Sequence, residues 1–243
     1  MNIFYHQKPL LSSAYNRADP CKNKEKRNGG FYMGNRAKKN ERASPLEGRW
    51  APAAKRALDL VGSLLLIAVT LPIMLFAAFG VRVSSPGPII FSQERVGFRG
   101  RVFRMHKFRT MRENSTPNAW TTPRDPRKTK FGTFLRRTAI DELPQLFNVL
   151  VGDMSLVGPR PEIPVFARKF EKTVPNYAKK HSVKPGMTGQ AQIMGLRGDT
   201  SIEARVRADI DYIENWSLWL DILILLKTPF KAHNKNEKYV GDK

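Results

Sequence analysis

The feature that most limits what this chain can fold into is a run of 22 residues without a charge, from Leu60 to Val81. At about 1.5 Å per residue, a straight helix of this length is about 33 Å long, against a hydrocarbon core of about 30 Å. Pro72 lies near the middle of the run, where it removes the backbone hydrogen bond to Ala68 and clashes with that carbonyl. The sequence therefore predicts a sharply bent helix with two arms that each reach about halfway through a bilayer.

The charges that flank this run favour one course for the helix. Both flanks are basic, and basic flanks prefer the cytoplasmic side of a membrane. The symmetry favours a re-entrant helix over residues 55–83, which enters and leaves the membrane on the same side. A proline-kinked transmembrane helix is the alternative, whereas the late start and the length of the run argue against a signal peptide. The flanking cations are Arg49, Lys55, Arg56, Arg82, Arg95, Arg99, Arg101, Arg104, Lys107, Arg109 and Arg112.

The composition limits the binding partners and the kinds of stabilising site that the chain can have. The chain has 42 Lys and Arg against 21 Asp and Glu, a formal charge of +21, which suits anionic lipid headgroups or nucleic acid. One cysteine, Cys21, and four scattered histidines exclude a disulfide framework and a cysteine/histidine zinc site. Residues 1–54 are expected to form a basic flexible arm, within which Met33 is an alternative start, and residues 233–243 a tail.

Between these ends, residues 84–232 show the pattern of an α+β domain that is mainly α-helical. A cluster of breakers at 84–88 precedes two short strands at 89–91 and 102–105, joined by a turn with Gly97 and Gly100. Residues 113–130 are expected to form a surface loop. The apolar stretch 216–226 fits an interfacial amphipathic helix or a buried core helix equally well. Two helical stripes are formed by Leu143, Leu146, Phe147 and Leu150, and by Ile202, Val206, Ile210 and Ile213.

The candidate chemistry lies in a pair of adjacent carboxylates, Asp141 and Glu142. Common hydrolase, nucleotide-triphosphatase and dinucleotide motifs are absent from the sequence. Pro144 is tolerated only in the first turn of a helix, so the pair is expected at a helix start. There Asp141 would stay ionised and either cap the helix or attack as a nucleophile. Glu142 could then hold a divalent cation such as Mg²⁺ together with substrate phosphates.

Basic residues could offset the negative charge where a carboxylate meets a phosphate. Arg160 lies between Pro159 and Pro161, which restrict the backbone around it. Taken singly, each of these cations fits an ordinary solvated surface position as well. The candidates are Lys107, Arg109, Arg136, Arg137 and Arg160.

Several motifs in one order resemble the bacterial sugar transferases, the polyprenyl-phosphate phosphoglycosyltransferases of the monotopic type. The resemblance covers residues 56–231, and it is carried by the segments 107–111, 135–145, 152–162, 184–190 and 212–228. It implies a re-entrant membrane helix and an active site on the cytoplasmic face of the bacterial inner membrane. Residues 84–232 would then be a cytoplasmic phosphoglycosyltransferase domain.

The resemblance also implies a reaction. A sugar 1-phosphate passes from a nucleotide sugar, usually a UDP-sugar, to undecaprenyl phosphate, which starts exopolysaccharide, capsule, O-antigen or glycan assembly. Asp141 would be the nucleophile that forms a phosphosugar intermediate and releases UMP. Asp141 and Glu142 would hold Mg²⁺, and the substrate phosphates would be bound by Lys107, Arg109, Arg136 and Arg160.

Two departures from the family pattern are visible. The family often has Ser before the proline of the membrane helix, where this chain has Leu71. Larger relatives carry transmembrane helices ahead of the catalytic part, so this chain looks like a minimal form. The alternatives are a basic nucleic-acid-binding protein, for which no recognised motif is present, and a membrane-anchored scaffold without catalysis. The sequence leaves open which sugar is transferred and whether the chain forms a homo-oligomer.

Overall fold

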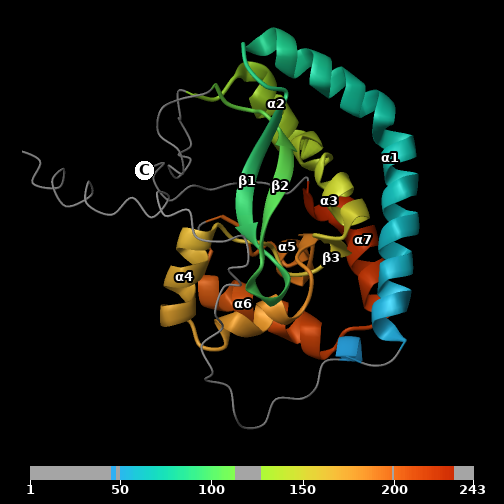
Figure 1. Cartoon of the computed structure of the whole chain (residues 1–243), viewed down its shortest axis with the longest axis vertical. Coiled ribbons are helices and arrows are strands. Elements are labelled where there is room, and N and C mark those ends of the chain that lie inside the picture. The colour runs from blue at the N-terminus through green and yellow to red at the C-terminus, as the bar shows by residue number, and fades with distance from the viewer. Residues whose placement is uncertain (1–44, 48–49, 113–126, 199, 233–243) are drawn as a thin grey trace, which may run out of the picture.

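The structure is a computed structural model that describes residues 45–47, 50–112, 127–198 and 200–232. Most of the expected arm, most of the expected loop at 113–130 and the expected tail at 233–243 lie outside these residues. The described residues form a mainly helical fold, as the sequence predicts, with two small sheets, of which the sequence predicts only the hairpin (Figure 1).

The apolar run forms a single long helix, α1 (Ala51–Ser84), which extends beyond the predicted range at both ends. The helix continues through Pro72, and Figure 1 shows that it bends part-way and turns its second arm toward α2 (Lys130–Thr138). Its length and composition are compatible with a membrane anchor. Large apolar side chains along it are exposed, namely Val61, Leu64, Leu65, Leu66, Val69, Leu71, Ile73, Leu75, Phe76, Phe79 and Val83. Re-entry into the membrane stays a prediction.

The predicted hairpin is confirmed and is longer than expected. Strand β1 (Ile90–Val96) pairs antiparallel with β2 (Val102–Phe108), in a register that runs from Ile90 opposite Phe108 to Val96 opposite Val102. A 3₁₀ turn, η2 (Phe98–Gly100), joins the strands, and Gly100 has a φ of 73°, which glycine adopts readily. The second sheet pairs β3 (Ser155–Val157) in parallel with β4 (Gly186–Thr188).

The remaining elements are short helices that surround the sheets (Figure 1). They are η1 (Pro45–Glu47), η3 (Ile140–Glu142), α3 (Gln145–Val151), α4 (Pro164–Thr173), η4 (Tyr177–Ser182), α5 (Gln190–Ile193), α6 (Ile202–Glu214) and α7 (Leu218–Ala232).

The helical stripes read from the sequence lie largely in the core. Leu146 and Ile213 are buried in one large cluster with residues of β2, β3 and α7, and Val206 is buried in another. Phe147 is the exception, because it is exposed on α3. A third cluster joins the second arm of α1 to β2 and α2 through Met74, Ala77, Val81, Phe108 and Leu135.

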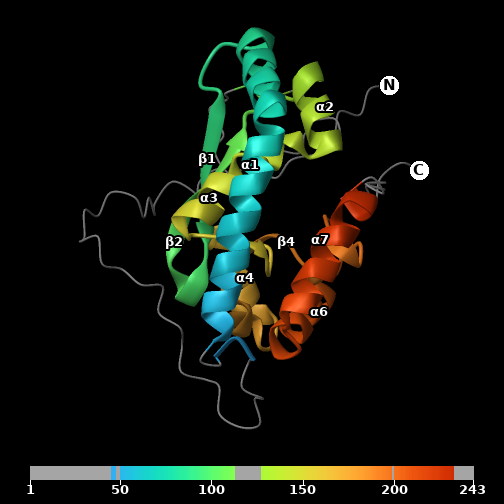
Figure 2. The same cartoon turned by 90° about the vertical axis from the view of Figure 1, so that its right-hand side faces the viewer.

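The stretch at 216–226 is partly buried in the core, and its placement at a membrane interface stays a prediction. Trp216 is buried before α7 begins, whereas Trp219 is 64% exposed. Other apolar side chains of α7 are exposed too, while Ile224 is fully buried. Helix α7 therefore packs one face on the core and leaves apolar side chains outside. Figure 2 shows α1 and α7 on the same side of the molecule.

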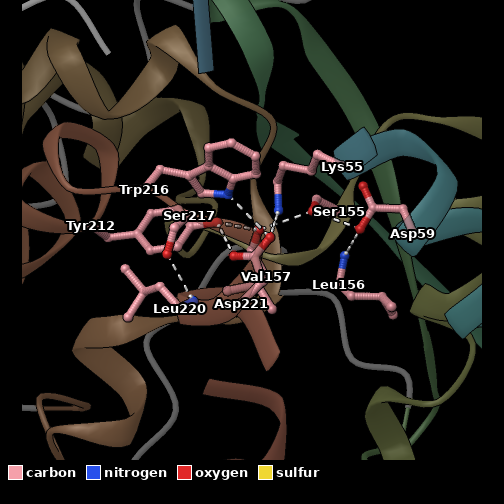
Figure 3. A network of polar contacts seen from close by, with 10 residues as sticks. All are labelled: Lys55, Asp59, Ser155, Leu156, Val157, Tyr212, Trp216, Ser217, Leu220 and Asp221. Carbon is pink, nitrogen blue, oxygen red and sulfur yellow. Dashed lines mark hydrogen bonds and ion pairs between the residues drawn. The ribbon is translucent and has the colours of Figure 1, made fainter. Parts of the chain in front are cut away.

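A buried polar network fastens α1 to this core (Figure 3). The Lys55 Nζ of α1 lies 2.7 Å from Asp221 Oδ2 of α7, and Tyr212 and Trp216 donate hydrogen bonds to the same carboxylate. One turn further along α1, Asp59 Oδ1 accepts hydrogen bonds from the Ser155 hydroxyl and the Leu156 N–H. Buried charges that are paired and hydrogen-bonded in this way fix the direction in which α1 leaves the domain.

Candidate active site

The two candidate carboxylates lie on a short turn between two helices, which we call the acidic turn (η3, Ile140–Glu142). Helix α2 ends because Ala139 adopts a left-handed conformation with a φ of 59°. Helix α3 then begins after Pro144, which occupies its N-cap position. The predicted placement at a helix start is thus corrected by about one turn, because the pair lies in a 3₁₀ turn that leads into α3 through Leu143 and Pro144, which both have right-handed helical backbone angles.

This placement gives the two carboxylates different surroundings. Asp141 is buried, with 6% of its surface exposed, whereas 24% of the Glu142 side chain is accessible. The N-cap position of α3 belongs to Pro144 and carries no side-chain hydrogen bond. The capping role that the sequence allows for Asp141 is therefore not the one at α3.

Glu142 gathers cations from two other segments. Its Oε1 lies 3.0 Å from Lys107 Nζ, at the end of β2, and 3.3 Å from Arg160 Nη2, after β3. Three segments that are far apart in the sequence thus meet at one carboxylate oxygen. This arrangement places two positive charges beside the acidic turn, where a phosphate could be bound.

The electrostatic effects on the two cations are opposite. Burial lowers the pKa of Lys107, and the nearby Glu142 carboxylate opposes that effect. Glu142 raises the pKa of Arg160, although burial acts against it. Arg160 therefore stays charged at every physiological pH, and the charge of Lys107 depends on its carboxylate neighbour.

The second sheet holds the Arg160 segment in position. The Gly158 N–H donates to the Thr188 carbonyl at 2.8 Å, and the Gly186 N–H donates to the Pro159 carbonyl at 2.9 Å. A Cβ on Gly158 would come within 2.6 Å of the Lys184 carbonyl oxygen. Glycine is required there because the two backbones approach so closely.

Two arginines near this site were not among the predicted residues. Arg95 of β1 donates to the Pro161 carbonyl at 3.2 Å, and burial together with Arg160 lowers its pKa to about 10. The pKa of Arg197 is lowered by burial and then by Arg160. Arg197 lies between Gly195 and Gly198, which both have positive φ values. That Gly-Leu-Arg-Gly run was the only signal that could have singled out Arg197 in the sequence.

The other candidate phosphate-binding residues are Arg136, Arg137 and Arg109. Arg136 lies in the last turn of α2, five residues before Asp141, and is partly buried, while Arg137 beside it is exposed. Arg109 is 4% exposed, and its Nη2 donates to the Ser85 carbonyl at 2.7 Å. The structure therefore groups Lys107 and Arg160 at Glu142 and directs Arg109 toward the end of α1.

The donor set of the acidic turn limits how a metal could bind. Within the part of the chain that the structure describes, no group of three or more His, Cys, Asp or Glu residues could hold a metal ion. Two adjacent carboxylates fit Mg²⁺ when the substrate's phosphates supply further oxygen ligands. Such a site would be completed only with the substrate.

Comparison with known proteins identifies the family. The family model described as "Bacterial sugar transferase" matches residues 50–235. A UDP-glucose:undecaprenyl-phosphate glucose-1-phosphate transferase of Xanthomonas campestris pv. campestris is 45% identical over 193 residues, which cover 76% of this chain and 40% of that protein. A protein of the same name from Caulobacter vibrioides is 47% identical over 180 residues, 72% of this chain and 67% of that protein.

A shorter relative matches over nearly its whole length. The exopolysaccharide production protein PSS of Rhizobium leguminosarum bv. phaseoli is 42% identical over 184 residues, 72% of this chain and 92% of that protein. By contrast, the alignment with the Xanthomonas protein spans about two fifths of that protein's length. The matched region holds α1, the acidic turn and both cation-bearing segments, so this chain belongs to the bacterial sugar transferase family.

Proposed function

We propose that this protein transfers a sugar 1-phosphate from a UDP-sugar to undecaprenyl phosphate, through an ester between Asp141 and the sugar phosphate. The observation that carries the proposal is the acidic turn, where a buried aspartate adjoins a glutamate that contacts Lys107 and Arg160. The names of the relatives support the two substrates.

The first half of the reaction would form the ester. An oxygen of the Asp141 carboxylate attacks the phosphorus that carries the sugar, and the bond from that phosphorus to the bridging oxygen breaks. UMP leaves with that oxygen. Lys107 and Arg160 supply positive charge for the phosphate oxygens, which lowers the repulsion between an anionic nucleophile and an anionic substrate. Arg197, which lies near Arg160, would contribute in the same way.

The second half would regenerate the enzyme. A phosphate oxygen of undecaprenyl phosphate attacks the same phosphorus, and Asp141 leaves as a carboxylate. The product is a lipid-linked diphosphosugar. Both nucleophiles are already anionic, so neither half needs a protein group to remove a proton.

Mg²⁺ fits this scheme as a cation shared between protein and substrate. We assign Glu142 and Asp141 as its protein ligands, and when bound it would supply positive charge to the diphosphate oxygens. Glu142 contacts Lys107 and Arg160 through Oε1, which places this carboxylate beside the cations that would bind the diphosphate.

The proposal includes a cellular location for the protein and a pathway in which it acts. Basic flanks on both sides of α1 support a re-entrant course, with the catalytic domain on the cytoplasmic face of the inner membrane. A relative named for exopolysaccharide production supports a role at the start of polysaccharide assembly. Since two relatives are named for UDP-glucose, that donor is the first to test.

The test separates a nucleophile from a structural carboxylate. Purified protein is incubated with each of a panel of UDP-sugars without a lipid acceptor, and intact mass and UMP release are measured. We expect a mass increase of one sugar phosphate for one donor, and we expect Asp141→Asn to abolish it and to lower turnover by about 10³-fold or more. Turnover retained in Asp141→Asn with only modest destabilisation would overturn the proposal.

A further inference from the structure

The second arm of α1 packs directly against the acidic turn. Ile140 and Leu143, which flank the two carboxylates, contact the cluster formed by Met74, Ala77, Val81, Phe108 and Leu135. The acidic turn therefore lies directly beside the apolar helix.

A hollow lies where α1 ends. The helix stops at Ser84, and Ser85, Pro86 and Gly87 line the hollow together with Arg112. Gly87 has a φ of 112°, so the chain turns sharply there. The Arg112 side chain is exposed, and it makes no hydrogen bond or ion pair with the described residues.

The buried guanidinium of Arg109 is hydrogen-bonded to the lining of this hollow. Arg109 Nη2 donates to the Ser85 carbonyl, but its Nε and Nη1 have no hydrogen-bond partner among the described residues. A buried donor without a partner costs free energy, more so when it is charged. The hydrogen bond at Ser85 thus explains only part of why a charged group is kept in this place.

Strand geometry relates this guanidinium to the acidic turn. The Arg109 N–H donates to the Ile89 carbonyl at 2.9 Å, which extends the hairpin ladder by one residue. Residues two apart on a strand point to the same side and lie about 6.6 Å apart along it, so Arg109 follows Lys107 on one face. Lys107 Nζ contacts Glu142. Two residues on the same face of this strand therefore contact the two places: Arg109 contacts the hollow through Ser85, and Lys107 contacts the acidic turn through Glu142.

We propose that the hollow at the end of α1, with Arg109 and Arg112, binds the phosphate monoester of the lipid acceptor before it attacks. This rests on the proposed function and assigns the second substrate to its own part of the site. Exposed apolar side chains of the last turns of α1, Phe79 and Val83, would accompany the isoprenoid chain. In the attack, the new bond joins an acceptor oxygen to the sugar-bearing phosphorus, and the bond from that phosphorus to Asp141 breaks.

The experiment measures the two halves of the reaction separately. The variants are Arg112→Gln, whose side chain supports no other part of the described fold, and Arg109→Gln, with Arg101→Gln at the exposed hairpin tip as control. The rate and amplitude of UMP release are measured with donor alone. The trapped intermediate is then mixed with undecaprenyl phosphate at several concentrations.

We expect Arg112→Gln to release UMP from donor alone within about twofold of wild type, since the donor contacts remain. We expect the half-saturating acceptor concentration to rise about tenfold or more, because a charge-assisted contact to phosphate is lost. The Arg101→Gln control should match wild type in both halves. A loss of UMP release equal to the loss of acceptor use, or an unchanged acceptor dependence in Arg112→Gln, would overturn the proposal.

A binding measurement needs no turnover and covers the case in which Arg109→Gln fails to fold. Thermal unfolding of the detergent-solubilised protein is followed with undecaprenyl phosphate, undecaprenol, phosphatidylglycerol or inorganic phosphate. Only undecaprenyl phosphate should stabilise wild type, and it should stabilise Arg112→Gln less. Equal stabilisation by phosphatidylglycerol or by inorganic phosphate would contradict a site for the acceptor. If no UDP-sugar releases UMP, the proposed function fails while this binding result still stands.

Discussion

Glu142 is the residue through which distant parts of the chain meet. One oxygen of this side chain contacts Lys107 and Arg160, and Arg95 and Arg197 lie near Arg160. Positive charge therefore exceeds negative charge around the acidic turn. Such an excess is unfavourable in the empty protein and is relieved when an anionic diphosphate binds. The charge balance of the site is thus suited to a bound substrate.

The lowered pKa of Lys107 leads to a prediction for the pH dependence. Because burial favours the neutral amine, Lys107 loses its proton at a lower pH than a free lysine, whose pKa is about 10.4. The rate of UMP release should therefore fall on the alkaline side, below that value. Lys107→Arg should move this fall to higher pH, because arginine stays protonated. A pH profile of UMP release for both proteins, with Lys130→Arg as control, measures the shift.

The lowered pKa of Lys107 also makes the stability of the folded protein depend on pH. Between the folded and unfolded pKa values of Lys107, the unfolded state binds the proton and the folded state does not, so its contribution to stability rises with pH in that window. Activity and this stability contribution should change in opposite directions there. An alkaline limb that stays at the same pH in Lys107→Arg would contradict a role for Lys107 in phosphate binding.

At the level of elements, the two arms of α1 are attached to the domain by different kinds of contact. Its first arm is fixed by polar contacts, for example Arg56, which donates to the Val149 and Leu150 carbonyls of α3 at 2.6 and 2.7 Å. Its second arm is fixed by apolar contacts with Phe108 and Leu135. Both arms are thus attached to the same domain, and the outward apolar side chains between these contacts remain exposed.

This attachment predicts that both ends of α1 lie on one side of the membrane. In a Cys21→Ser background, single cysteines replace Trp50, which is 75% exposed, or Arg82, which is also exposed. A membrane-impermeant maleimide should label neither position in intact spheroplasts and both in inverted membrane vesicles. Labelling of the two positions from opposite sides would show a helix that crosses the membrane and would contradict the re-entrant course.

At the level of the whole molecule, buried charged side chains join the domain to the long apolar helix α1. Lys55 and Asp221 are both buried and are 166 residues apart in the sequence. Asp221 also accepts hydrogen bonds from Tyr212 and Trp216, so its carboxylate is satisfied on several sides. The network in Figure 3 therefore makes α1, α6 and α7 one unit.

Replacing the Asp221 carboxylate should strongly destabilise the fold, because it leaves the Lys55 charge buried and unpaired. We expect Asp221→Asn to lower the free energy of unfolding by about 3–5 kcal/mol. The matched control is Glu214→Gln, which removes a partly exposed pair with Lys179 at 2.8 Å and should cost no more than about 1 kcal/mol. Denaturant unfolding in detergent measures both. Similar losses in the two variants would show that burial of the pair does not matter.

The sequence by itself determined the local features of this protein. The apolar run and Pro72 predicted a bent helix, the glycine turn predicted the hairpin, and Pro144 located the start of α3 to within a turn. These features depend on interactions between residues close in the chain, such as lost backbone hydrogen bonds and side-chain periodicity. The motif order also indicated the family, which the comparisons confirm.

Only the tertiary structure decided which charges meet. Nothing in the local pattern distinguishes Lys107 and Arg160, which contact Glu142, from Arg109, which holds the end of α1. The partners of Lys55 and Asp59 likewise come from segments about a hundred residues or more away. Contacts of this kind depend on how sheets and helices pack, because side chains far apart in sequence are brought together only when the backbone between them is folded.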